Sequence, residues 1–198
     1  MHIFLETDRL VLRRFTDDDV DNLVDLDSDP DVMHFINGGR PTPREEIQDD
    51  VLPAFLGYYE RFAGYGFWAA IEKSTGDFLG WFHFRPPKGR SLDDVELGYR
   101  LRKSAWRKGY ATEASRALIH KGFTELGVQR VFAETMAVNV ASRRVMEKAG
   151  VTGRCRELSR ACRGGACARP FLRCPGRTSP IRRRSGPPRR SIPAGRRP

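Results

Sequence analysis

The chain has 198 residues, of which 39% are hydrophobic and 10% aromatic, enough for one domain with a substantial core. No apolar run approaches the roughly 20 residues that a membrane-spanning helix needs. The N-terminal sequence MHIFLETDRL has acidic residues and no basic region leading into an apolar stretch, unlike a signal peptide. We therefore expect a cytoplasmic protein with no membrane partner.

The formal net charge of +10 is unevenly distributed along the chain. Residues 151–198 contain 14 arginines, no lysine and a single acid, Glu157, so this segment carries +13 and the preceding 150 residues carry −3. The body of the protein is therefore mildly acidic, and electrostatic contact with nucleic acid is expected only from the basic end.

Before residue 93, hydrophobic periodicity and turn residues predict three strands and two helices. The expected elements are a strand over Leu5–Phe15, a helix from Asp17 to about Leu26, an apolar segment at Met33–Ile36, a helix capped by Thr42 and running through Tyr59, and a hairpin of Phe67–Glu72 with Phe78–Arg85.

After residue 93, a strand is expected at Val95–Leu101, because every second residue is apolar. A helix follows from about residue 110, then a strand over Arg130–Met136 and a helix from Asn139 to Ala149. Antiparallel hairpins followed by one strand–helix–strand unit predict an α/β fold with a mixed sheet.

The turn between the strand and the first of these helices has the chemistry of a phosphate site. Gly109 and Ala111 remove side-chain bulk at a helix start, where unpaired N–H groups and the positive end of the helix dipole lie. Arg107 and Lys108 add positive charge. We therefore predict a pyrophosphate cradle over Trp106–Ala111.

From Val151 onward the sequence does not predict a packed core. Seven prolines and six glycines accompany the arginines of residues 151–198, and such a composition is typical of disorder. It fits either a coding sequence read in a shifted frame or a basic tail that binds phosphates without sequence preference. The four cysteines form no C-x-x-C pair, so unpaired thiols are expected in place of a zinc site.

The succession VELGYRL, WRKGYATEA and NVASRRVMEKAG resembles the GCN5-related N-acetyltransferase (GNAT) superfamily. LETDRLVLRRFTDDD and SDPDVMHFI are similar to the start of its ribosomal-protein N-terminal acetyltransferase-like group. The resemblance covers residues 5–150 and implies one domain there, with a mostly antiparallel central sheet flanked by helices. Members continue into two further strands, so we expect these terminal strands to be lost and Arg130–Met136 to become an exposed edge.

The resemblance implies a bacterial enzyme that transfers an acetyl group from acetyl-CoA to a primary amine, either a protein N-terminus or a small molecule, without a metal. Leu101 and Arg102 would offer backbone groups to the pantetheine arm from a strand that splays from its neighbour, and Asn139 would hydrogen-bond that arm. The implied cofactor-binding residues are Leu101, Arg102, Arg107, Lys108, Gly109, Ala111, Thr112 and Asn139.

Glu96 and Ser142 are the proposed catalytic residues, and each also has a purely structural interpretation. Glu96 lies on the strand nearest the implied thioester and is the first candidate for the general base, but it also fits a solvent-facing position of an alternating strand. His83 is a second candidate base or a structural histidine. Ser142 would protonate the leaving thiolate, or merely cap its helix.

The aromatic residues of the hairpin, and the chain as a whole, each have a functional and a non-functional interpretation. Trp68, Trp81, Phe82 and Phe84 would line an acceptor pocket or pack in the core. The alternative function is a catalytically impaired GNAT fragment whose basic tail binds nucleic acid nonspecifically.

Overall fold

The computed structural model describes residues 2–87, 89–156 and 172–173, with side chains through Val151. Most of the predicted tail, with the shifted-frame and nucleic-acid interpretations that rest on it, falls outside the described residues. The cysteine side chains fall outside them too. In the described part of the chain, no helix is long and apolar enough to cross a membrane.

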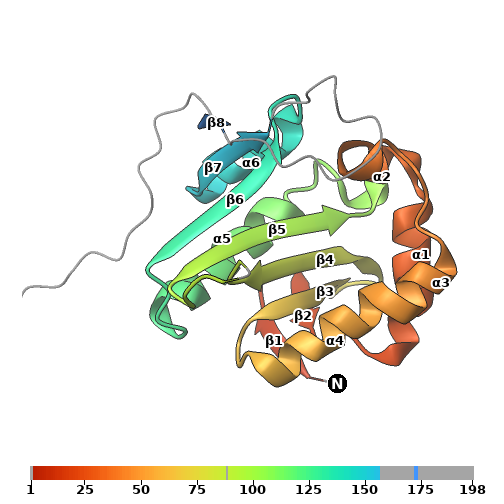
Figure 1. Ribbon diagram of the computed structural model, residues 1–198, viewed down its shortest axis with the longest axis horizontal. Helices are drawn as coiled ribbons and strands as arrows, with labels where there is room; N and C mark the ends of the chain where they lie inside the picture. Colours follow the sequence, from red (N-terminus) through yellow and green to blue (C-terminus); the bar gives the residue numbers. More distant parts are fainter. Residues whose placement is uncertain (1, 88, 157–171, 174–198) are drawn as a thin grey trace, which may run out of the picture.

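The described strands form one sheet in which spatial order follows chain order (Figure 1). Strands β1 to β5 are antiparallel, β5–β6 and β6–β7 are parallel, and β7–β8 is antiparallel. This confirms the predicted α/β mixed sheet. The strands are β1 Ile3–Glu6, β2 Leu10–Arg13, β3 Gly66–Glu72, β4 Phe78–Arg85, β5 Asp94–Leu101, β6 Arg130–Met136, β7 Thr152–Arg156 and β8 Leu172–Arg173.

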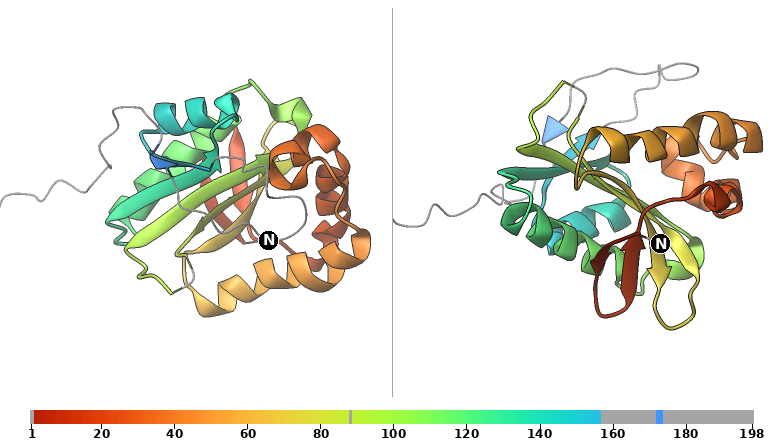
Figure 2. Two further views of the ribbon diagram at one scale, coloured as in Figure 1. Left: turned by 45° about the horizontal axis from the view of Figure 1, so that its top comes forward. Right: turned by 90° about the horizontal axis from the view of Figure 1, so that it is seen from below.

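Helices cover both faces of the sheet, as Figure 2 shows in its right-hand view. One face carries α1 Val20–Ser28, α2 Pro30–Asn37, α3 Arg44–Glu46, a π-helical turn at Ile47–Val51 and α4 Leu52–Arg61. The other carries α5 Tyr110–Thr124 and α6 Val140–Ala149. Short 3₁₀ turns lie at Asp17–Asp19 and Lys103–Ala105.

The predicted alternation along β5 divides the molecule into two cores. Val95, Leu97 and Leu101 are buried against α5 and α6. Glu96 and Arg100 therefore point to the face that α1 to α4 cover, because successive strand residues face opposite sides. The position of each β5 side chain thus follows from its sequence period.

Two predicted elements near the N-terminus differ from the structure. The single strand over Leu5–Phe15 is the hairpin β1–β2, because the Thr7 hydroxyl accepts the Leu10 amide at 3.0 Å and closes a turn. Met33–Ile36 lies within α2, which Pro30 begins and the Asp29 side chain caps.

Thr42 does not cap the next helix. Its hydroxyl donates to Asp27 Oδ2 at 3.1 Å, and Pro43 holds the N-cap position of α3. The threonine therefore joins two segments of the helical layer.

The structure also differs from the expectation that the chain has no strand after Gly150. Gly150 ends α6 in the left-handed region, with a φ of 74°, and the chain turns back into β7. Residues 132–136 of β6 pair with residues 152–156 of β7, so β6 is not an exposed edge. The TGRCR sequence of β7 lacks an apolar alternation, which is why the residue pattern does not predict this strand.

Candidate active site

The sheet opens between β5 and β6. The two strands pair only at Asp94–Arg130, Val95–Val131 and Glu96–Phe132, and from Phe132 onward β6 pairs with β7. Beyond Glu96 the strands diverge (Figure 1). Among the described strands, the divergence leaves the second half of β5 without a partner on this side, as the resemblance implies.

Backbone groups of β5 face this opening at every second residue. The Arg102 amide donates to the Leu79 carbonyl of β4 at 2.8 Å. Because alternate residues direct their N–H and C=O groups to opposite edges of a strand, Leu97, Tyr99 and Leu101 direct theirs towards β6. The Trp106 indole N–H donates to the Leu101 carbonyl at 2.8 Å.

The prediction for Leu101 therefore fits this geometry, while the one for the Arg102 backbone does not. The Arg102 amide is bonded to β4, and its carbonyl accepts the Ala105 amide at 2.9 Å. Tyr99 has its backbone groups on the edge that faces the opening, and the two-residue period of the strand would have indicated this.

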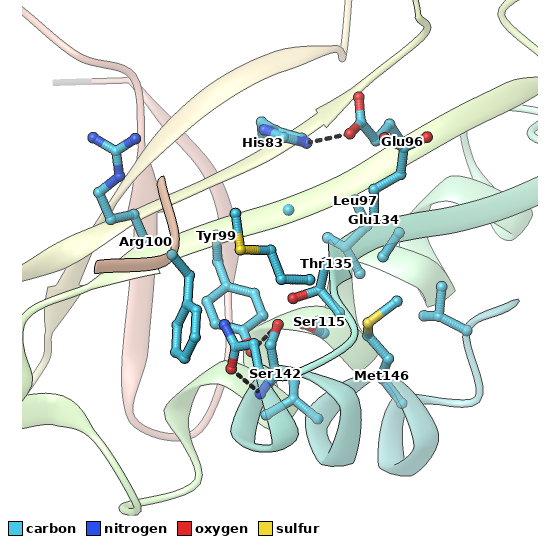
Figure 3. A pocket seen from close by; sticks show the side chains of 18 of the residues that line it. His83, Glu96, Leu97, Tyr99, Arg100, Ser115, Glu134, Thr135, Ser142 and Met146 are labelled. Carbon is cyan, nitrogen blue, oxygen red and sulfur yellow. Dashed lines mark hydrogen bonds and ion pairs between the residues drawn. The ribbon is translucent and has the colours of Figure 1, made fainter. Parts of the chain in front are cut away.

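A cleft of about 210 Å³ lies in the opening between the strands. Trp81, His83, Glu96 and Arg100 line its side towards α1 to α4, and Tyr99, Asn139, Ser142 and Met146 line its side towards α5 and α6. Figure 3 shows Glu96 with His83 on one side of β5, and Tyr99 with Ser142 on the other. The cleft thus reaches both faces of the sheet.

This cleft brings together three of the predicted site residues, Glu96, Asn139 and Ser142. The others follow the end of β5 along the chain, between Leu101 and Thr112. Of the four hairpin aromatics, Trp81 lines the cleft, while Trp68, Phe82 and Phe84 are buried in the α5–α6 core.

The Glu96 carboxylate lies among charged and polar neighbours. Its Oε2 is 3.2 Å from the Arg85 guanidinium and its Oε1 is 3.9 Å from His83 Nε2. Only 19% of its side chain is exposed, so it is not the solvent-facing residue of the alternative interpretation.

The His83 ring lies flat over the backbone of β5 because position 98 is glycine. A Cβ at Gly98 would approach His83 Cε1 to 2.5 Å and Nε2 to 2.6 Å. Burial, reinforced by the charges of Arg85 and Arg100, lowers the pKa of His83 to about 3. The imidazole is therefore neutral near pH 7, its contact with Glu96 is not an ion pair, and it holds a proton too weakly for a general base there.

Ser142 lies in the first turn of α6 but is not its cap. The Asn139 side-chain oxygen accepts the Ser142 amide at 3.0 Å and is the N-cap. The Tyr99 hydroxyl donates to Ser142 Oγ at 3.3 Å, and burial raises the pKa of Tyr99, which keeps that donor protonated. The Ser142 hydroxyl is therefore held at the cleft by β5.

The start of α5 has the open amides expected of an anion site. Arg107 and Gly109 adopt left-handed conformations, with φ of 60° and 89°, and no side chain caps the helix. Arg107 and Lys108 are exposed, while Tyr110 is packed in the core. The first-turn N–H groups and two cations thus lie together beyond the end of β5, a set that fits a pyrophosphate.

An open seam between two parallel strands, followed by an uncapped helix start, is the architecture of an acyl-CoA-binding transferase. A family model described as an acetyltransferase (GNAT) domain matches residues 9–152. The chain belongs to this family, whose acetyl donor is acetyl-CoA.

Comparison with individual proteins agrees with this family assignment. Over 134 residues the chain is 37% identical to FsC-acetyl coenzyme A-N(2)-transacetylase of Aspergillus fumigatus, covering 64% of this chain and 55% of that protein. The chain therefore spans about half the length of this relative. Relatives in Bacillus subtilis include YkkB, an uncharacterized protein that is 34% identical over 74% of this chain and 84% of its own length.

Solved structures share the fold. A GNAT-family acetyltransferase from Bacillus anthracis has a TM-score of 0.61 at 28% identity, covering 76% of this chain and 82% of its own. RimL, a ribosomal L7/L12 alpha-N-protein acetyltransferase in complex with coenzyme A, has a TM-score of 0.64 at 18% identity, covering 75% and 82%. At this identity RimL shows the fold alone.

Proposed function

We propose that this protein is an acetyl-CoA-dependent N-acetyltransferase that acts on a primary amine in the cytoplasm. The observation that carries the proposal is the divergence of β5 from β6 after Glu96. It leaves backbone groups of Leu97 and Tyr99 facing a cleft, with the Leu101 amide further along the same edge of β5. This edge suits an extended amide-containing arm such as pantetheine. Arg107, Lys108, Gly109, Ala111 and Thr112 would hold the pyrophosphate, mainly through backbone amides.

The chemistry divides between the two faces of the sheet. The nitrogen of the neutral acceptor amine attacks the thioester carbonyl of the donor, and Glu96 takes the proton that this nitrogen loses as the C–N bond forms. The C–S bond breaks, Ser142 gives a proton to the departing thiolate, and the proton on Glu96 returns to Ser142 through solvent. A β5 amide directed into the opening stabilises the oxyanion that forms at the carbonyl.

The acceptor side of the cleft has an apolar wall and a carboxylate. Phe35 and Ile36 of α2 and Trp81 of β4 line it beside Glu96. Arg100, which also lines the cleft, is bonded to both carboxylate oxygens of Asp27 at 2.5 Å. This wall suits an amine joined to an apolar group.

Both acceptor classes remain within the proposal. The resemblance of LETDRLVLRRFTDDD and SDPDVMHFI to the ribosomal-protein group supports a protein N-terminus, and the Aspergillus relative supports a small-molecule amine. A panel of N-terminal peptides and small primary amines, with thiol release as the readout, distinguishes them.

Titration calorimetry of the full chain with acetyl-CoA tests the donor site. We expect saturable binding of one molecule per chain. Absence of binding would overturn the proposed function, while binding without turnover on any amine of the panel would favour an impaired enzyme.

Glu96→Gln tests the base. We expect kcat to fall by about 100-fold, the lower range for a general base, while the Kd for acetyl-CoA changes less than about twofold, because the cofactor contacts remain. Steady-state kinetics and calorimetry measure the two effects. Glu45→Gln, on the exposed surface of α3, is the matched control. An unchanged pH–rate profile in Glu96→Gln would show that Glu96 is not the general base.

A further inference from the structure

The turn of the β1–β2 hairpin is bonded to the start of α5, about a hundred residues later in the chain. Arg9 NH1 donates to the Lys108 carbonyl at 3.0 Å. Arg9 Nε and NH2 donate to Glu113 Oε2 at 2.8 and 2.5 Å. The Arg9 guanidinium also stacks over the Tyr110 ring, 4.5 Å from its centroid. One side chain therefore contacts the turn before the helix and the first turn of the helix.

Glu113 holds this arginine in place through bonds at both of its carboxylate oxygens. Besides the guanidinium, Oε1 accepts the Thr7 hydroxyl at 2.6 Å and the Arg9 amide at 3.1 Å. Burial alone would raise the pKa of Glu113, but these bonds outweigh burial and leave its pKa below the ordinary value of 4.5. The carboxylate stays ionised at neutral pH and neutralises the guanidinium.

The bond to Lys108 sets the direction of the neighbouring amide. A trans peptide is planar, so the Lys108 carbonyl and the Gly109 N–H point in opposite directions. Lys108 lies between two left-handed residues, Arg107 and Gly109, and such a segment has few local bonds to fix its peptide planes. With its carbonyl held by Arg9, this peptide must direct the Gly109 N–H to the other side, away from the hairpin.

We propose that Arg9 is a positioning residue for the donor pyrophosphate: it fixes the Lys108–Gly109 peptide so that the Gly109 amide points at the anion. The proposal rests on the proposed function. We assign Arg9 to positioning and not to phosphate binding, because Glu113 neutralises its charge and each of its three guanidinium nitrogens already donates one hydrogen bond within the protein.

The test compares a ligand with a pyrophosphate and one without. Arg9→Met keeps the apolar stem and removes the donors. By calorimetry, we expect the Kd for coenzyme A to rise about tenfold, the value of one well-oriented hydrogen bond. The Kd for pantetheine, measured by competition, should stay within about twofold because that ligand lacks the pyrophosphate.

Arg61→Met is the matched control. Arg61 also donates to a carbonyl, that of Gly57 at 2.9 Å, and stacks over a tyrosine, Tyr58 at 5.1 Å, but it lies on α4. We expect both affinities to remain unchanged in this variant.

Two results would overturn the proposal. An unchanged Kd for coenzyme A in Arg9→Met removes the positioning role, and an equal loss for both ligands assigns Arg9 to general stability of the fold. Should Arg9→Met fail to fold, Glu113→Gln replaces it, with the same ligand pair and a smaller selective loss expected. Failure of wild-type protein to bind coenzyme A counts instead against the proposed function.

Discussion

At the scale of single residues, the cleft depends on a histidine and a glycine that face each other across β4 and β5. Gly98 leaves the space that the His83 ring fills, and the ring in turn contributes to the wall beside Glu96. His83 Nε2 is buried and has no hydrogen-bond partner in the described part of the chain. A neutral ring tolerates this position, whereas an imidazolium would face Arg85 and Arg100.

This arrangement predicts acid sensitivity. Because the pKa of His83 is about 3 in the folded protein and 6.5 unperturbed, the unfolded state binds an extra proton between these values, and stability present above pH 6.5 is lost as the pH falls. Between pH 6 and 4, the unfolding free energy of wild type should fall more steeply than that of His83→Gln, by about 1.4 kcal/mol per pH unit. Urea denaturation at the two pH values measures it; parallel slopes would contradict the assignment.

At the scale of elements, the start of α6 combines capping with a candidate cofactor contact. Asn139 lines the cleft and uses its side-chain oxygen for the Ser142 amide, so its side-chain nitrogen is the atom that can donate to a ligand there. The two roles use different atoms of one side chain, so they can be separated by substitution.

Asn139→Asp keeps the capping oxygen and loses the N–H donor, whereas Asn139→Ala loses both. We expect Asn139→Asp to retain wild-type stability and Asn139→Ala to lose about 1 kcal/mol, the usual value of a cap. Both should bind coenzyme A more weakly. Urea denaturation and calorimetry provide the readouts, and undiminished binding by both variants would remove Asn139 from the cofactor site.

At the scale of the whole molecule, ion pairs join the helical layer to the end of β5. Arg100 pairs with Asp27, Arg102 with Asp25 and Lys103 with Asp31. These pairs hold α1 and α2 against β5, and α2 carries Phe35 and Ile36 of the proposed acceptor wall. Under the proposed function, the relative position of the two substrates would therefore depend on contacts between the layers.

The pairs should contribute unequally. The Asp27 and Arg100 side chains are 4% and 16% exposed, so Asp27→Asn leaves a buried cation without its partner and should cost about 3 kcal/mol. Asp31 and Lys103 are 56% and 60% exposed, so Asp31→Asn should cause no measurable change, since solvent screens such pairs. Equal midpoints of urea denaturation for the two variants would refute this difference.

The alternation of apolar residues in β5 and the glycine-containing helix start after it are local patterns. They determined the side-chain directions of Glu96 and Leu101 and the place where α5 begins. Only the tertiary structure decided the rest. The sheet opens where β6 pairs with β7, a strand without apolar alternation. Asn139, and not Ser142, caps α6. Arg9 bonds Glu113, which lies 104 positions away in the sequence. Local periodicity indicates which face of an element is buried. It does not indicate which distant polar group will form a hydrogen bond with a given donor or acceptor.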